Sequence, residues 1–273
     1  LGLTSAELNQ ITAGNLIIGR NDIATDRVTV SSAVAPANAT ALEVITARDI
    51  LVSANITGGS GGLTLSANQQ ATPTAESFAG VTVQLGAVVS AAGSGAVTVL
   101  GTGGSGTISS NYGVWVRNSS QITSSGGAVS VTGTGGGSGA SGDNYGVLVF
   151  AGGVITSAGT GAGSTVTVEG TGGNTSGTGS GNYGVLVAGS GSRITSSGGA
   201  VSVTATGNTG SNPAEALRLQ NFGAITSGGN ASITITADSV NFTGSPLGFI
   251  NSGTGTTTIR PRTAGTRINL GGA

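Results

Sequence analysis

Carboxylates are the side chains of this sequence that could act as general acids, general bases or metal ligands. Enzymes that cleave glycosidic bonds need two such groups facing each other across a groove. His, Cys and Met are absent, which excludes a Ser-His-Asp triad, a thiol nucleophile and the usual zinc and haem sites. The ten acids are Glu7, Asp22, Asp26, Glu43, Asp49, Glu76, Asp143, Glu169, Glu215 and Asp238.

Two of these acids, Asp143 and Glu169, fall within the most regular part of the chain. They occupy different positions of the repeat described below, so the pattern does not pair them. The segment 136–144 resembles a calcium-binding nonapeptide, but its single Asp is misplaced and no copy follows. We therefore predict that the protein is not an enzyme, that it has no catalytic residue, cofactor or metal, and that these acids are surface charges.

A repeated unit organises the chain. Tyr112, Tyr145 and Tyr183 lie 33 and 38 positions apart, each within the sequence Asn-Tyr-Gly-Val-x-Val. A tract of Gly, Ser and Thr, variable in length, closes each unit. A fixed period of this kind is typical of a solenoid. Glycine occurs 53 times, but Val and Ile recur regularly between the glycines, which disordered tracts do not show.

Each unit contains three short segments of alternating apolar and polar residues, at 113–117, 121–123 and 128–132 in the first clear copy. Val114 and Val116 share a face, and so do Val129 and Val131. Stacked coils would let each strand pair with its counterpart about 4.8 Å away. The sequence therefore predicts an all-β fold, a right-handed parallel β-helix with about three strands per coil of roughly 32–39 residues.

The predicted organisation is a single solenoid module, 1–273. Weaker copies place Ala41, Gly80 and Ala216 at the position of Gly113, so we predict stacked coils over 16–246. Thr4 and Glu7 match a capping box, which predicts one or two helical turns over 5–12 in an N-terminal junction, 1–15. The segment 247–273 is predicted to be a C-terminal junction coil. No polar capping element is expected at either end.

Two columns of like residues are predicted along the stack. Asn111, Asn144 and Asn182 occupy one position in consecutive units, and we expect a ladder of hydrogen-bonded side-chain amides. The three Tyr residues share parity with the core Val residues. We therefore expect a buried or corner-packed aromatic column.

An apolar stripe is predicted on the outer face, formed by Trp115, Leu148 and Leu186, which oppose the core residues by parity. The same alignment places Glu43 and Thr82 before the stripe and Arg218 after it. Two interpretations stay open at this stage. The stripe is either a contact surface for a partner solenoid or a glycan, or it is covered by a loop.

The distribution of charge bears on the partners. The net charge is −1, which favours neither nucleic acid nor an anionic membrane, and we expect no membrane insertion. Acids outnumber Arg near the N-terminus, among them Asp22 and Asp26, whereas the C-terminal region carries Arg260, Arg262 and Arg267. We predict that copies or adjacent modules stack head to tail through these residues. The strand expected over 268–270 would then lie beside residues 16–18 of the following module.

The sequence also resembles a known group of proteins. The opening LGLTSAELNQITAGNLIIG, the NYGVxV…ITSSGGAVSVTGTGG units and the closing IRPRTAGTRINLGGA resemble modules of large bacterial exoproteins, the filamentous-haemagglutinin-like adhesins of two-partner secretion and autotransport. The resemblance implies an exported module at the cell surface or outside the cell. It further implies a structural and adhesive role in a fibre, with host, neighbouring-cell or matrix glycans as possible partners.

Two other functions compete with adhesion. A carbohydrate-binding or carbohydrate-active β-helix would bring acids together in one groove. An ice-binding face is suggested by outward Ser and Thr pairs, although Leu100 and Glu169 interrupt the array. The pairs are Ser130 with Thr132, Ser202 with Thr204, and Thr234 with Thr236.

Overall fold

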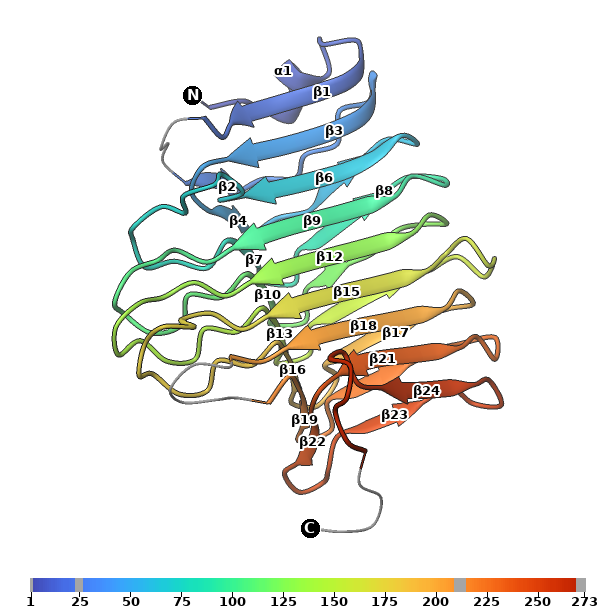
Figure 1. Cartoon of the computed structure of the whole chain (residues 1–273). Helices are drawn as coiled ribbons and strands as arrows, with labels where there is room; N and C mark the ends of the chain where they lie inside the picture. The colour runs from blue at the N-terminus through green and yellow to red at the C-terminus, as the bar shows by residue number, and fades with distance from the viewer. Residues whose placement is uncertain (1, 23–26, 209–214, 269–273) are drawn as a thin grey trace.

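Short strands of alternating apolar and polar residues stack coil upon coil in the computed structural model, which describes residues 2–22, 27–208 and 215–268 (Figure 1). Each strand pairs in parallel with its counterpart in the next coil, and within these residues the strands form three sheets. In Figure 1 the front strands run from right to left, and the chain returns behind them as it descends. This winding is right-handed. The predicted right-handed parallel β-helix is confirmed.

The three sheets are named A, B and C here. Sheet A contains β1 (Ala13–Arg20), β3 (Ala39–Thr46), β6 (Gly62–Ala67), β9 (Val97–Thr102), β12 (Val129–Thr134), β15 (Val166–Thr171), β18 (Val201–Thr206), β21 (Ile233–Ala237) and β24 (Thr257–Arg260). Sheet B contains β2 (Val28–Val30), β4 (Ile50–Val52), β7 (Val81–Val83), β10 (Val114–Arg117), β13 (Val147–Phe150), β16 (Val185–Ala188), β19 (Leu217–Gln220) and β22 (Val240–Thr243). Sheet C contains β5 (Ile56–Gly58), β8 (Val88–Ala91), β11 (Gln121–Ile122), β14 (Val154–Ser157), β17 (Arg193–Ser196), β20 (Ala224–Thr226) and β23 (Phe249–Asn251).

Columns of Val and Ile fill the interior. In sheet A, Val131 pairs in register with Val99 on one side and Val168 on the other, and all three side chains are buried. The residue that follows each of them points outward. Because strand side chains alternate between faces, the alternation seen in the sequence directly separates core from surface.

Glycine permits close approach at the corner between sheets A and B. A Cβ atom at Gly133 would lie 2.1 Å from the carbonyl oxygen of Gly146 in the next coil, and one at Gly170 would lie 2.2 Å from that of Gly184. A side chain at either position would therefore push neighbouring coils apart.

The first coils have a different register from the one expected. Ala41 pairs with Gly62 in sheet A, whereas Gly80 precedes a strand of sheet B, so Ala41 is not the counterpart of Gly80. Glu43 accordingly lies on sheet A and not beside the apolar stripe. The misassignment arose because strands of different sheets share the same alternation. The first coil is also short, since Val28 pairs with Ile50 only 22 positions later.

A short helix, α1 (Ser5–Leu8), covers part of the N-terminal end. The predicted capping box is present: Thr4 Oγ1 accepts from the amide of Glu7 at 3.2 Å, and Glu7 Oε2 accepts from the amide of Thr4 at 2.7 Å. The hydrogen bond from the Thr4 amide, together with one from the Thr4 hydroxyl to Glu7 Oε2 at 2.8 Å, lowers the pKa of Glu7. Leu8 is buried, and Asn9 Oδ1 accepts from the amide of Ala37 at 2.8 Å. The helix α1 is shorter than predicted and covers only part of this end, where β1 and β2 remain the outermost strands of their sheets.

The C-terminal end continues the stack. β23 and β24 extend sheets C and A, respectively. Ile259 and Phe242 are the last members of two interior columns and are 50% and 39% exposed. Asp238 Oδ1 accepts from the amides of Arg262 and Thr263 at 2.9 and 2.8 Å, which holds the turn after β24. Of the strand expected over 268–270, Ile268 is exposed and outside any strand, and 269–270 lie outside the described residues.

No helix within the described residues has the length and apolar character required for a membrane span.

The column structure leads to a prediction about stability. Val131 is fully buried, so Val131→Asp should lower the free energy of unfolding by about 3 kcal/mol or more, because it places an unpaired carboxylate in the interior. Ser130→Asp, on the neighbouring outward position, is the matched control and should have a much smaller effect. Chemical denaturation followed by circular dichroism measures both, and equal losses would contradict the observed register.

Candidate functional site

The Asn ladder predicted from the sequence is present. Asn111 Nδ2 donates to Asn144 Oδ1, and Asn144 Nδ2 donates to Asn182 Oδ1, each at 2.9 Å. The same oxygens accept the backbone amides of Asn111 and Asn144 at 3.0 Å. All three side chains are fully buried, so each amide depends on its neighbours for its hydrogen bonds. The ladder thus fixes the segments that lead into β10, β13 and β16.

The three Tyr residues form a stacked column outside the Val interior. The ring centroids of Tyr112 and Tyr145 are 5.2 Å apart, and those of Tyr145 and Tyr183 are 5.3 Å apart, with interplanar angles of 18° and 10°. The rings pack against Leu148 and Leu186 on the outer face of sheet B. Tyr112 does not point into the interior with the core Val residues, because β10 begins at Val114 and the backbone before it is not a strand.

The apolar stripe is stacked as expected but is not an open contact surface. Trp115, Leu148 and Leu186 are in register, with Thr82 before them and Arg218 after them. Leu148 is 4% exposed and Leu186 is 7% exposed, because the Tyr rings cover them. The interpretation of the stripe as a contact surface was therefore wrong. The cover consists of the Tyr side chains that precede each strand.

The ring faces inside the aromatic column are not free for a sugar. Each inner face is occupied by the next ring, and the guanidinium of Arg218 lies 5.2 Å from the centroid of Tyr183 at one end of the column. Tyr145 donates its hydroxyl to Asp143 Oδ1 at 2.9 Å. Burial, reinforced by this hydrogen bond, raises the pKa of Tyr145 above its usual range, so the phenol is neutral at ordinary pH. The geometry is that of a structural cluster.

The acids of the repeats lie apart. Asp143 lies beside the Tyr column, whereas Glu169 projects from the outer face of sheet A, between Thr132 and Thr204 of the adjacent coils. No group of three or more His, Cys, Asp and Glu residues that could hold a metal ion occurs in the part of the chain that the structure describes. Asp143 and Glu169 therefore do not face each other across one groove, as a glycosidase would require.

A row of hydroxyl groups runs along the outer face of sheet A. It occupies one register position in seven successive coils, and every member is Ser or Thr. The row consists of Thr64, Thr98, Ser130, Thr167, Ser202, Thr234 and Thr258. The alignment of the repeats within the sequence identified only members of this row that have a second hydroxyl two residues later. It missed the row because Leu100, Glu169 and Arg260 interrupt the adjacent one.

The residues predicted at the module junction lie at opposite ends of the solenoid. Asp22 pairs with Arg20 at 2.5 Å near the end of β1, and Asp26 lies outside the described residues. Arg260 ends β24, where its Nε donates to Thr236 Oγ1 at 3.1 Å. Arg262 and Arg267 follow, and both are exposed. Strands β1 and β24 are the two outermost strands of sheet A.

Ion pairs already engage much of the charge near the N-terminus. Arg27 Nε lies 2.5 Å from Asp49, and Arg48 bridges Asp49 and Glu76 at 3.7 and 2.6 Å. The excess of acids counted in the sequence is therefore a weaker source of attraction between ends than the count suggests. The free strand edges and exposed apolar side chains are the stronger features there.

The aromatic column can be tested at its central ring. Tyr145→Ala should lower the free energy of unfolding by about 3–5 kcal/mol, because it removes two ring contacts and uncovers Leu148. Tyr145→Phe keeps the stack and loses only the hydrogen bond to Asp143, a loss of about 1 kcal/mol. Urea denaturation measures both. Equal effects of the two variants would show that the ring does not act as a cover.

Comparison with known proteins adds no relative: no protein-family model, no curated protein and no solved structure matches the chain.

Proposed function

We propose that this chain is a structural and adhesive repeat module of an exported bacterial cell-surface or extracellular protein, and that modules stack end to end into an elongated fibre. The observation that carries the proposal is the pair of free outer edges on one sheet. In the described residues β1 has β3 as its only neighbour and β24 has β21 as its only neighbour. Such edges offer backbone donors and acceptors to another strand.

The two edges match in register. Ile17 and Thr258 belong to the same outward position of sheet A, which runs from Ile17 through Glu43 and Thr64 to the hydroxyl row. A second copy shifted along the solenoid axis therefore places its β1 beside β24, with residues of the same register position adjacent to each other. The contact joins different surfaces of the two copies, so it propagates as a filament and does not close as a dimer.

A fibre of this kind supports adhesion through repetition. Each module presents the same rows of outward side chains along a stiff rod. Many weak contacts made by such rows together give high avidity. The resemblance of the opening, the repeats and the closing segment to exported adhesins supports the location outside the cell.

The chain offers a clean test because it contains no Cys. Ile17→Cys and Thr258→Cys in one chain should form disulfides between copies. Paired strands lie about 4.8 Å apart, within the Cα separation that a disulfide spans. Under mild oxidation, non-reducing electrophoresis should show a ladder of linear oligomers. The out-of-register control, Asn15→Cys with Thr258→Cys, places the Cα atoms about 8 Å apart and should cross-link poorly. A similar yield from both pairs would refute the proposed stacking.

A second candidate function is ice binding, favoured by the uninterrupted hydroxyl row on sheet A. The seven hydroxyls repeat at the coil spacing of about 4.8 Å on a sheet held rigid by its neighbours. A regular array of hydroxyls can hold water molecules in a repeating pattern. The charged Glu169 beside the row opposes this function.

Thermal hysteresis decides between the two functions. If the row binds ice, Thr167→Lys in its centre should remove most of the hysteresis, because a long charged side chain disrupts the array. Thr156→Lys, at an outward position of sheet C, is the matched control and should retain it. Absence of hysteresis in the unmodified chain would dismiss the ice-binding candidate.

A further inference from the structure

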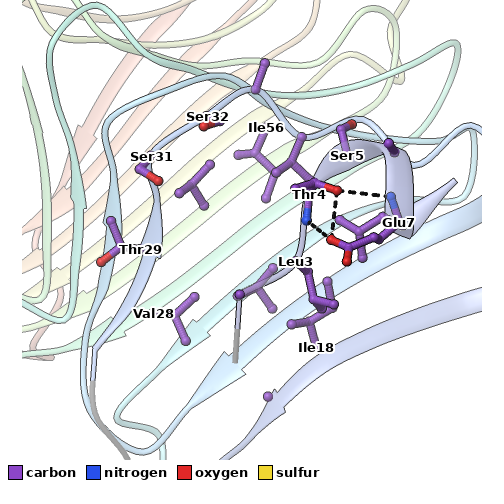
Figure 2. Close-up of a pocket in the computed structure, with 18 of the residues that line it drawn as sticks. Leu3, Thr4, Ser5, Glu7, Ile18, Val28, Thr29, Ser31, Ser32 and Ile56 are labelled. Carbon is purple, nitrogen blue, oxygen red and sulfur yellow. Dashed lines mark hydrogen bonds between the residues drawn. The ribbon is translucent and has the colours of Figure 1, made fainter.

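A cavity lies at the N-terminal end of the solenoid, between α1 and the first coil (Figure 2). Its volume is about 970 Å³, and its lining is mainly apolar, including Leu3, Leu8, Ile18, Val28 and Ile56. Several of these residues are members of the interior columns. It is partly open to solvent, because in the described residues no further coil covers this end of the stack. The side chains of an additional coil would pack here.

The missing element corresponds to one strand of sheet B. The chain before β1 supplies α1 on the side of sheet C, next to the segment at Ala35 and Ala37. No strand of the described residues lies beyond β2, which is the first strand of sheet B. The cavity borders β2 along residues 27–32. A strand placed there would extend sheet B along the solenoid axis as far as α1 and β1.

The free edge of β2 faces this position. The amide of Val28 donates to Asp49 O, and the carbonyl of Val30 accepts from the amide of Ser53, both at 2.9 Å, on the β4 side. Backbone groups of alternate residues in a strand point to opposite edges. The amide and carbonyl of Thr29 therefore point away from β4, towards the vacant position.

The chain contains a segment that matches such a strand. Residues 260–270 repeat the pattern of residues 20–30: Arg20 and Arg27 correspond to Arg260 and Arg267, and the apolar pair Val28 and Val30 corresponds to Ile268 and Leu270. In both stretches the first residue of this apolar pair follows the last residue of a sheet A strand by eight positions. By this spacing, segment 268–270 corresponds in sequence to β2, the sheet B strand that follows β1.

We infer that segment 268–270 of a second copy occupies the cavity as a strand of sheet B, pairing with β2 and placing Ile268 and Leu270 over Val28 and Val30. The segment of the same chain cannot do so, because β24, which precedes it, and β2 lie at opposite ends of the solenoid (Figure 1). The pairing partner is thus β2 and not the 16–18 region expected from the sequence. This inference rests on the proposed end-to-end stacking and identifies its junction.

A synthetic peptide of residues 263–273 tests the inference on the full chain. The peptide should bind, and hydrogen exchange at the Thr29 amide should slow when it does. A peptide carrying Ile268→Ser and Leu270→Ser should bind roughly a hundredfold more weakly, because two side chains no longer fill the cavity. The Asn269→Ser peptide is the matched control, since position 269 lies on the opposite face of the strand, and it should bind like the parent.

A change in the chain provides the complementary test. Thr29→Pro removes the amide that faces the cavity and should abolish binding, whereas Thr29→Val keeps that amide and should bind normally. Circular dichroism checks that both variants are folded. If Thr29→Pro does not fold, the comparison of the parent and substituted peptides tests the inference instead. No binding of the parent peptide, or equal binding of the doubly substituted peptide, would overturn the inference.

If the chain with cysteines at 17 and 258 polymerises while the peptide does not bind, stacking stands and this junction is wrong. Binding without polymerisation would keep the strand site and reject the fibre.

Discussion

Backbone pairing between consecutive coils is the constraint on which the structure depends. Each strand forms its hydrogen bonds with the coils before and after it, so every side chain stands beside the residue at the same position one coil away. One residue type can therefore be repeated along a column only if it tolerates a neighbour of its own kind. Val, Asn and Tyr satisfy this condition in different ways, through packing, amide hydrogen bonds and ring stacking.

The same constraint explains why charge is scarce. Like charges directly opposite each other on neighbouring strands are destabilising, so a charged residue cannot be repeated along a column as Val or Asn can. Charged residues make up 7% of the chain, and those on the sheets have uncharged neighbours. Glu169 stands between Thr132 and Thr204, and Arg117 stands next to Phe150 and donates to Gln84. Charge gathers where the stack ends and the constraint relaxes.

The sequence alone was sufficient for the fold and the Asn ladder, because period-two alternation and a constant offset between copies determine which residues stack. It failed where the backbone leaves the strands. Parity predicted a buried or corner-packed Tyr column but not its side, and because the chain turns before Val114 the rings cover the outer face of sheet B. It also failed where two sheets share one pattern, as for Ala41. The cover provided by α1 and the continuity of the hydroxyl row depend on three-dimensional register, which no single copy of the repeat contains.

The amide ladder has a consequence for how such a chain can change over generations. Asn144 bonds to an identical residue on each side, so removing one coil would leave Asn111 facing Asn182, with the same bonds available. Recombination between copies in the gene would thus create no new kind of internal surface. The chain can lengthen or shorten by whole coils, which changes the distance that it spans while each remaining coil keeps the same kind of contacts.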